Sequence, residues 1–276
     1  MSHPRAAAPL SVQLFSVRDA LEADPDAALA RLAETGFQHV EPYGLCRPDR
    51  TPAENLVAVR HLRAALDRAG LGVSAVHAGL PEDLGQLAEA CAALEADTVF
   101  VPHPHMVTAA SPFDEATFTS GDTTALDAFA ARLGEAAAAA DTHGLRLGYH
   151  NHWFEWAILP DGTTAWDRFW SRAGEHLAAE VDLYWVAAAG ADPVAVLDHL
   201  AERTLSLHLK DGPAEPWQPQ TPLGTGRVDV DAALGHAPDS VRWHVVEVDS
   251  TDLDPFELLA GNARALVRRG HSTWQG

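Results

Sequence analysis

The fold is decided by the stretch Ser206-Leu207-His208-Leu209-Lys210, in which leucine alternates with polar side chains. Successive side chains of a β-strand point to opposite faces, so the leucines share one face while His208 and Lys210 share the other. The leucine face suits contact with covering helices, as in a parallel sheet that is buried on both sides. We therefore predict that His208 and Lys210 point into the interior of a closed sheet.

Similar apolar stretches recur along the whole chain, and amphipathic helical patterns separate them. The eight predicted strands are Ser11–Phe15, His39–Pro42, Gly72–His77, Thr98–Pro102, Arg146–Asn151, Glu180–Tyr184, Ser206–Lys210 and Trp243–Asp249. The predicted helices include Pro25–Thr35, Glu54–Ala69 and Thr124–His143. Two later helices are expected to open at Asp192-Pro193 and Asp254-Pro255, because aspartate caps free amides and proline fits the first helical position.

The regular succession of strand and helix predicts the fold class. Eight strand-helix units spaced by about 25 to 40 residues favour an α/β fold, a (β/α)8 TIM barrel, with residues 1–276 as a single domain. A doubly wound open sheet is the alternative. Such a sheet usually has fewer units and often a glycine-rich phosphate loop after its first strand, which this sequence lacks.

Composition limits the partners of the protein. The formal net charge is -20, from 39 acidic and 19 basic residues, and such a surface repels nucleic acid and anionic membranes. The two cysteines, Cys46 and Cys91, lie in no motif, which favours a reducing compartment without disulfides. Met1–Pro9 lacks the apolar core of a signal peptide, so we expect a cytoplasmic protein. A homo-oligomer is left open.

Lysine usage singles out one position. Of the 19 basic residues only Lys210 is a lysine, and the other 18 are arginine. An ammonium is compact and can titrate, whereas a guanidinium cannot replace it in either respect. This contrast favours a functional role for Lys210.

Polar residues end the last four predicted strands, where barrel enzymes place their active sites. His150, Asp182, His208 and Glu247 stand at these ends and offer imidazole and carboxylate donors without thiolate. Such donors suit one divalent metal ion. The fourth donor is open, because His152 and Glu155 compete with His150 for that place.

Further polar residues follow the earlier strands. Glu41, His77 and His103 end predicted strands two, three and four, and we expect them, like His152, to contact the substrate. Arg227 is the one basic residue placed to bind a phosphate group, and the lack of a fuller phosphate cradle favours an unphosphorylated substrate.

These residues resemble the sugar phosphate isomerase/epimerase family, the xylose isomerase-like TIM barrels. The resemblance covers nearly the whole chain and depends on several motifs together. They are Val12-Gln13-Leu14-Phe15-Ser16-Val17-Arg18, Gly36-Phe37 with Val40-Glu41, Tyr149-His150-Asn151-His152 with Phe154-Glu155, Val181-Asp182-Leu183-Tyr184-Trp185, His208-Leu209-Lys210-Asp211-Gly212, Gly224-Thr225-Gly226 and Val246-Glu247-Val248-Asp249.

The resemblance implies one divalent ion (Mn, Mg, Co or Zn) held by Glu, Asp, His and Glu from strands five to eight. Asp182, His208 and Glu247 match the last three donors. The first departs from the family pattern, because His150 stands where many epimerases have glutamate. That glutamate is also one of two proton-transfer bases in those enzymes, so Glu155 would have to replace it.

The resemblance implies a metal-dependent sugar isomerase or epimerase that abstracts a proton next to a carbonyl and passes through an enediolate. Glu247 is the predicted base. Lys210, with a depressed pKa beside a cation, is the predicted acid-base or oxygen-polarising group. The alternative is a 3-keto-glycoside lyase or hydrolase acting by β-elimination. More remote alternatives are DNA repair of the endonuclease IV type, against which the charge argues, and a non-catalytic sugar binder.

Overall fold

The computed structural model describes residues 7–107 and 113–274. The expectation that Met1–Pro9 does not form a signal peptide concerns residues that lie mostly outside these ranges. The described residues form two compact units, one comprising 7–41, 65–74 and 181–274, and the other comprising 42–64, 75–107 and 113–180.

A parallel sheet forms the centre of the first unit. Its strands follow the order β3-β2-β1-β9-β8, and the short strand β10 pairs with the N-terminal end of β1. The strands are β1 (Ala8–Gln13), β2 (His39–Glu41), β3 (Gly72–Val73), β8 (Thr204–Leu209), β9 (Trp243–Val246) and β10 (Ser272–Thr273). Every residue of β8 is buried, as its alternating leucine and polar side chains predicted.

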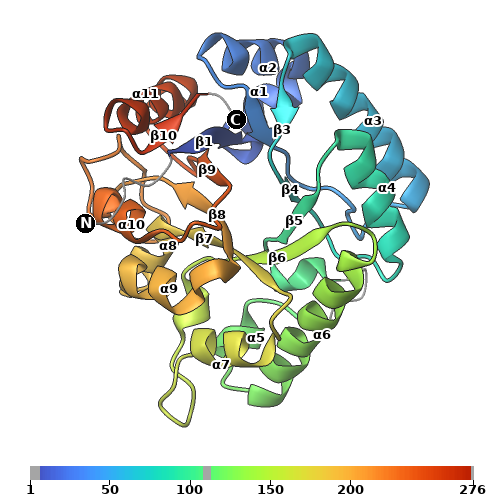
Figure 1. The fold of residues 1–276 in the computed structure, drawn as a ribbon, viewed down its shortest axis with the longest axis vertical. Coiled ribbons are helices and arrows are strands. Elements are labelled where there is room, and N and C mark those ends of the chain that lie inside the picture. Colours follow the sequence, from blue (N-terminus) through green and yellow to red (C-terminus); the bar gives the residue numbers. More distant parts are fainter. Residues whose placement is uncertain (1–6, 108–112, 275–276) are drawn as a thin grey trace. The chain divides into compact units, whose positions relative to one another are not determined.

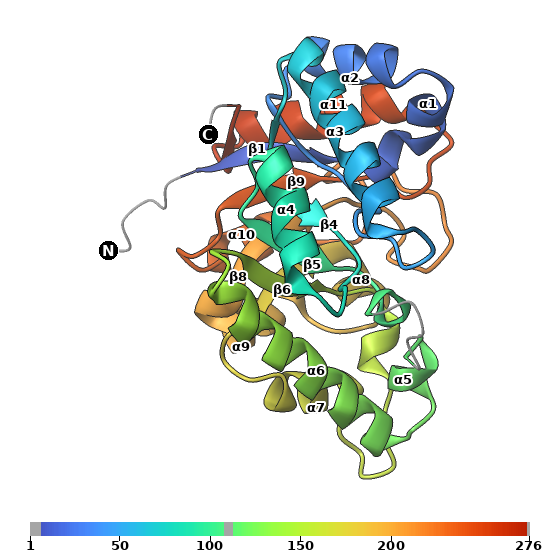
Figure 2. The same ribbon diagram turned by 90° about the vertical axis from the view of Figure 1, so that its right-hand side faces the viewer.

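Helices follow the strands of the first unit in the expected alternation. They are α1 (Arg18–Ala23), α2 (Pro25–Glu34), α8 (Leu183–Ala188), α9 (Pro193–Leu200), α10 (Val230–His236) and α11 (Pro255–Arg268). Figure 1 shows α11 (red) against β9 and β10, and Figure 2 shows α1 beside α2. The Asp-Pro prediction is confirmed, because Asp192 and Asp254 accept backbone N–H groups at the starts of α9 and α11.

The second unit has its own run of parallel strands, in the order β4-β5-β6-β7. These are β4 (Val76–His77), β5 (Thr98–Val101), β6 (Arg146–His150) and β7 (Ala178–Asp182), of which the last two residues belong to the first unit. Its helices are α3 (Pro52–Ala69, whose last turn belongs to the first unit), α4 (Leu84–Leu94), α5 (Ala116–Thr119), α6 (Thr123–Asp141) and α7 (Ala165–Arg172). The long helix α6 packs along α7, as both views show (Figures 1 and 2).

Strand ends differ from the predicted ones in a consistent way. The predicted strand Glu180–Tyr184 ends at Asp182, whose side chain caps the helix α8 that follows, so Tyr184 is helical. Strand β9 likewise ends at Val246, and Glu247 and Asp249 follow it in a loop. Apolar residues continue past these strands because the next turn is also buried.

The two cysteines are not joined to each other. Cys46 and Cys91 are both buried and free. Among the described residues, no helix combines the length and apolar character that a membrane span requires.

Candidate metal and active site

Three side chains converge in the first unit. Asp182 ends β7, His208 lies in β8 and Glu247 follows β9, and all three are buried. Each offers a metal-ligating atom, and these atoms lie within 4.8 Å of one another. The structure thus brings together three of the four predicted metal ligands.

The imidazole of His208 lies between two carboxylates. Its Nε2 atom is 2.7 Å from Oε2 of Glu41, and its Nδ1 atom is 2.8 Å from Oε2 of Glu247. Gln13 donates to the same Glu41 oxygen at 2.7 Å, and Glu41 pairs with Gln13 in the register of β1 and β2. Glu41, predicted as a substrate contact, therefore lies in the buried cluster and orients His208.

Lys210 lies among three carboxylates. Its Nζ atom is 2.6 Å from Asp182 Oδ2, 2.5 Å from Glu247 Oε2 and 2.6 Å from Asp249 Oδ2. Burial lowers the pKa of Lys210, but these carboxylates outweigh burial and raise the pKa well above its usual value. This direction is opposite to the expected one, which assumed a metal ion beside Lys210, so a depressed pKa in the metal-bound protein stays a prediction.

The cluster has more negative than positive charge. The Lys210 ammonium contacts the carboxylates of Asp182, Glu247 and Asp249, and a fourth carboxylate, that of Glu41, contacts His208. Burial raises the pKa of Asp182 to about 7, even though Lys210 opposes this shift. A second cation that binds beside such a carboxyl can displace its proton and stabilise the ionised form. Oxygen and imidazole donors, close together and short of positive charge, fit a divalent metal ion.

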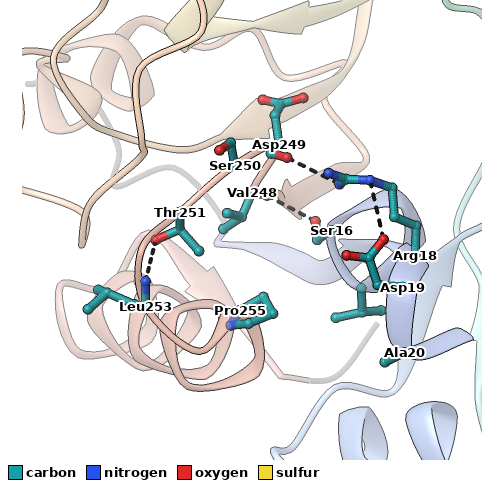
Figure 3. Close-up of a pocket in the computed structure, with 11 residues that line it drawn as sticks. Ser16, Arg18, Asp19, Ala20, Val248, Asp249, Ser250, Thr251, Leu253 and Pro255 are labelled. Carbon is teal, nitrogen blue, oxygen red and sulfur yellow. Dashed lines mark hydrogen bonds and ion pairs between the residues drawn. The ribbon is translucent and has the colours of Figure 1, made fainter. Parts of the chain in front are cut away.

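A cavity of about 220 Å³ adjoins Asp249 in the first unit, between the segments that follow β1 and β9. Figure 3 shows Arg18 reaching across it toward Asp249. The Arg18 guanidinium donates to the carbonyl oxygens of Phe15 and Asp249 at 3.0 and 3.1 Å. Ser250 and Thr251 complete the wall on the β9 side, so the cavity presents polar groups suited to hydroxyls.

Arg227 does not join this cluster. Its side chain is 72% exposed, and its nearest ion-pair partner, Glu215, lies 3.8 Å away and is exposed as well. Arg227 as a phosphate-binding residue stays a prediction.

In the second unit, two predicted residues converge on a third that was not predicted. His77 Nε2 lies 2.5 Å, and His150 Nδ1 3.1 Å, from the same oxygen of Glu180. All three side chains are buried. Glu180 was predictable from the sequence, because it lies two residues before Asp182 and therefore on the same face of the strand.

His103 and His152 also lie together in the second unit. Their rings stack at a centroid distance of 4.2 Å. Burial, aided by His105 and His77, lowers the pKa of His103 to about 4, so its imidazole is neutral near pH 7. The two stacked imidazoles present a flat face with polar edges.

Glu155 has a different environment from the one expected of a metal ligand. The carboxyl is fully buried, and it accepts hydrogen bonds from the Tyr149 hydroxyl at 2.8 Å and from the His152 backbone N–H at 3.0 Å. Burial raises its pKa from the usual 4.5 to about 8, against the effect of these hydrogen bonds. Burial therefore favours the neutral carboxyl, and the hydrogen bonds fix its position in the turn after β6. The catalytic role of Glu155 stays a prediction.

We expect Glu155→Gln to change how stability depends on pH. Between pH 4.5 and 8 the unfolded chain loses this proton while the folded protein keeps it, so Glu155 destabilises the wild type progressively as pH rises. The variant should match the wild type near pH 4 and exceed it by a few kcal/mol above pH 8. Urea unfolding of both proteins across this range measures the difference. The exposed change Glu257→Gln should give a flat difference, and an equally flat one for Glu155→Gln would contradict the raised pKa.

Comparison with known proteins agrees with this architecture. The family model described as xylose isomerase-like TIM barrel matches residues 29–247. A sugar phosphate isomerase/epimerase from Parabacteroides distasonis superposes with a TM-score of 0.73 at 19% identity, covering 100% of this chain and 98% of the other. A comparison with curated proteins found no match to the chain.

Two further solved structures share the fold. A probable 3-DHS dehydratase, AsbF, from Bacillus anthracis has a TM-score of 0.66 at 16% identity, covering 95% of this chain and 99% of its own. An L-ribulose 3-epimerase has a TM-score of 0.61 at 18% identity, covering 96% and 94%. The predicted α/β fold class, a (β/α)8 TIM barrel, is confirmed. Since the family model spans well over half of its length, this chain belongs to the xylose isomerase-like TIM barrel family.

Proposed function

We propose that residues 1–276 act as one barrel domain, an enzyme that uses a divalent metal to abstract a proton next to the carbonyl of a small sugar or keto-sugar. The observation that carries this proposal is the buried cluster of Asp182, His208 and Glu247, in which Lys210 contacts the two carboxylates. Burying several carboxylates beside one cation costs free energy unless a further cation balances their negative charge.

Asp182, His208 and Glu247 would hold the ion, and the fourth donor stays open. Manganese, magnesium, cobalt and zinc all accept such donors. When bound, the ion would act as a Lewis acid toward the oxygens of the substrate.

The side chains of the cluster have separate proposed roles. Glu247 is the base, because its carboxylate is held by His208 and Lys210 with its acceptor oxygen toward the cluster. The Lys210 ammonium, kept charged by its carboxylates, stabilises negative charge that develops on a substrate oxygen. Return of the proton to the opposite face gives an epimer, and return to the neighbouring carbon gives an isomer.

Elimination is the second candidate. The same carbanion would expel a group from the β carbon, and the likeness to a probable 3-DHS dehydratase favours this outcome. Released aglycone from a 3-keto-glycoside would distinguish elimination from isomerisation, which releases nothing.

Metal binding provides the first test. We expect the protein to bind one Mn²⁺ or Co²⁺ per chain, and Asp182→Asn or His208→Ala to weaken this affinity by about 100-fold or more, because even outer partners of metal ligands contribute about 10–100-fold. Calorimetric titration of the metal-stripped protein measures it. Asp192→Asn is the matched control, since Asp192 also caps a helix but is exposed. Equal affinities in all these proteins would refute the assignment.

A further inference from the structure

A buried carboxylate organises the loop that follows β8. Asp211 is 1% exposed and accepts four backbone N–H groups. These come from Gly212 at 2.8 Å, Gly224 at 2.8 Å, Gly226 at 2.9 Å and Val228 at 3.1 Å. Among the described residues Asp211 forms no ion pair, so backbone amides alone compensate its charge. Such charge-assisted hydrogen bonds are about twice as strong as neutral ones.

The loop closes tightly on Asp211 at Gly226. A Cβ atom at Gly226 would lie 2.1 Å from Oδ1 of Asp211 and 2.3 Å from the backbone of Gly212. Only glycine permits this approach. The backbone carbonyl of Asp211 also accepts the Thr221 N–H at 2.9 Å, so Asp211 holds both the middle and the end of the loop.

The middle of this loop carries Gln220, which holds Asp249 from two sides. The Gln220 amide donates to Asp249 Oδ2 at 2.7 Å, and its carbonyl accepts the Asp249 N–H at 2.8 Å. Its backbone N–H also donates to the Ser250 carbonyl at 2.7 Å. Gln220 is itself buried, so these contacts are protected from water. Asp249 Oδ2, fixed in this way, is the oxygen that lies 2.6 Å from Lys210 Nζ.

We propose that Asp211 is a positioning residue of the candidate site, which acts through the loop and Gln220 to hold Asp249 against Lys210. Asp211 follows Lys210 in the chain, but among the described residues its carboxylate forms no hydrogen bond or ion pair with Lys210 or with the predicted metal ligands. Its effect is to fix the third carboxylate of the lysine, and with it the direction of the ammonium. The catalytic consequence rests on the proposed function, whereas the positioning itself does not.

The chain provides its own reporter, because Lys210 is its only lysine. Protein labelled with ¹⁵N-lysine therefore gives a single side-chain Nζ signal in its NMR spectrum, which needs no assignment. We expect Gln220→Glu, which replaces the donor facing Asp249 with an oxygen, to shift this signal, and Asp211→Asn to shift it in the same direction. Asp229→Asn is the matched control: Asp229 accepts a backbone N–H at the start of α10, just beyond the loop, and should leave the signal unchanged.

The activity arm uses solvent deuterium uptake by a panel of ketoses that includes L-ribulose. We expect Gln220→Glu and Asp211→Asn to lower kcat about 10–100-fold, as loss of outer partners does, with KM within about twofold. If the wild type exchanges none of these sugars, the proposed function fails, while the lysine signal still tests the positioning. An unmoved signal in Gln220→Glu overturns the proposal, and so does an unmoved signal in folded Asp211→Asn. If Asp211→Asn does not fold, Gly226→Ala replaces it as the variant that displaces the loop, with the same expected shift.

Discussion

Lys210→Met is expected to lower the free energy of unfolding by about 3–5 kcal/mol at pH 8, the usual effect of leaving a buried charge without its partner. The lysine is 0% exposed and lies within 2.6 Å of three carboxylate oxygens, so its loss leaves their mutual repulsion uncompensated. Lower pH should reduce the deficit, because the carboxylates of the variant then take up protons. Urea unfolding in the presence of a chelator, at pH 6 and pH 8, measures both effects.

Arg168→Met is the control for this experiment. Arg168 forms a two-pronged ion pair with Asp127 at 2.7 Å, but the side chains are 23% and 35% exposed. Partly exposed pairs contribute about 1 kcal/mol or less. If Lys210→Met costs no more than Arg168→Met, the lysine does not balance the charge of the buried cluster, and the cluster does not require an additional cation.

Glu247→Gln is expected to lower the rate of solvent deuterium uptake by about 10²–10⁴-fold, the usual contribution of a general base. Glutamine keeps the size of the side chain but cannot accept the proton. The fold should persist, because the hydrogen bonds to His208 and Lys210 require only one acceptor oxygen. Proton NMR in deuterated buffer measures the uptake at saturating Mn²⁺.

The matched control is Glu257→Gln, the same substitution at an exposed position in the first turn of α11, which should exchange at the wild-type rate. Metal content must be measured in both variants, so that a lost base is distinguished from a lost ligand. A metal-loaded Glu247→Gln protein with the wild-type rate would assign the base to another residue.

Local pattern was sufficient to predict many elements of this fold, although Gly72–His77, predicted as one strand, forms the two strands β3 and β4. Alternation in β8, apolar helical stripes and the two Asp-Pro caps depend on near neighbours in the chain, and the structure confirms them. Pattern was less reliable at strand ends. Leu183 and Tyr184 continue the apolar character of β7 but begin α8, because Asp182 caps that helix.

The partners within the site were harder to predict. Asp182, His208 and Glu247 were recognisable because each ends a strand with a metal-ligating group. Gln13 and Gln220 were missed as site residues, since amides at strand ends or in loops carry no signal until their distant partners are known. The charge state of Lys210 likewise depends on Asp249, whose approach is set by a loop contact rather than by strand register.

The burial of the one lysine has a consequence for covalent labelling. Reagents that acylate primary amines react with the uncharged amine and only where it is accessible, and Lys210 in the folded protein is charged and buried. Acylation of this side chain therefore requires the surrounding structure to open first. The rate at which it is acylated measures how often the protein opens, at one chemically unique point in its interior.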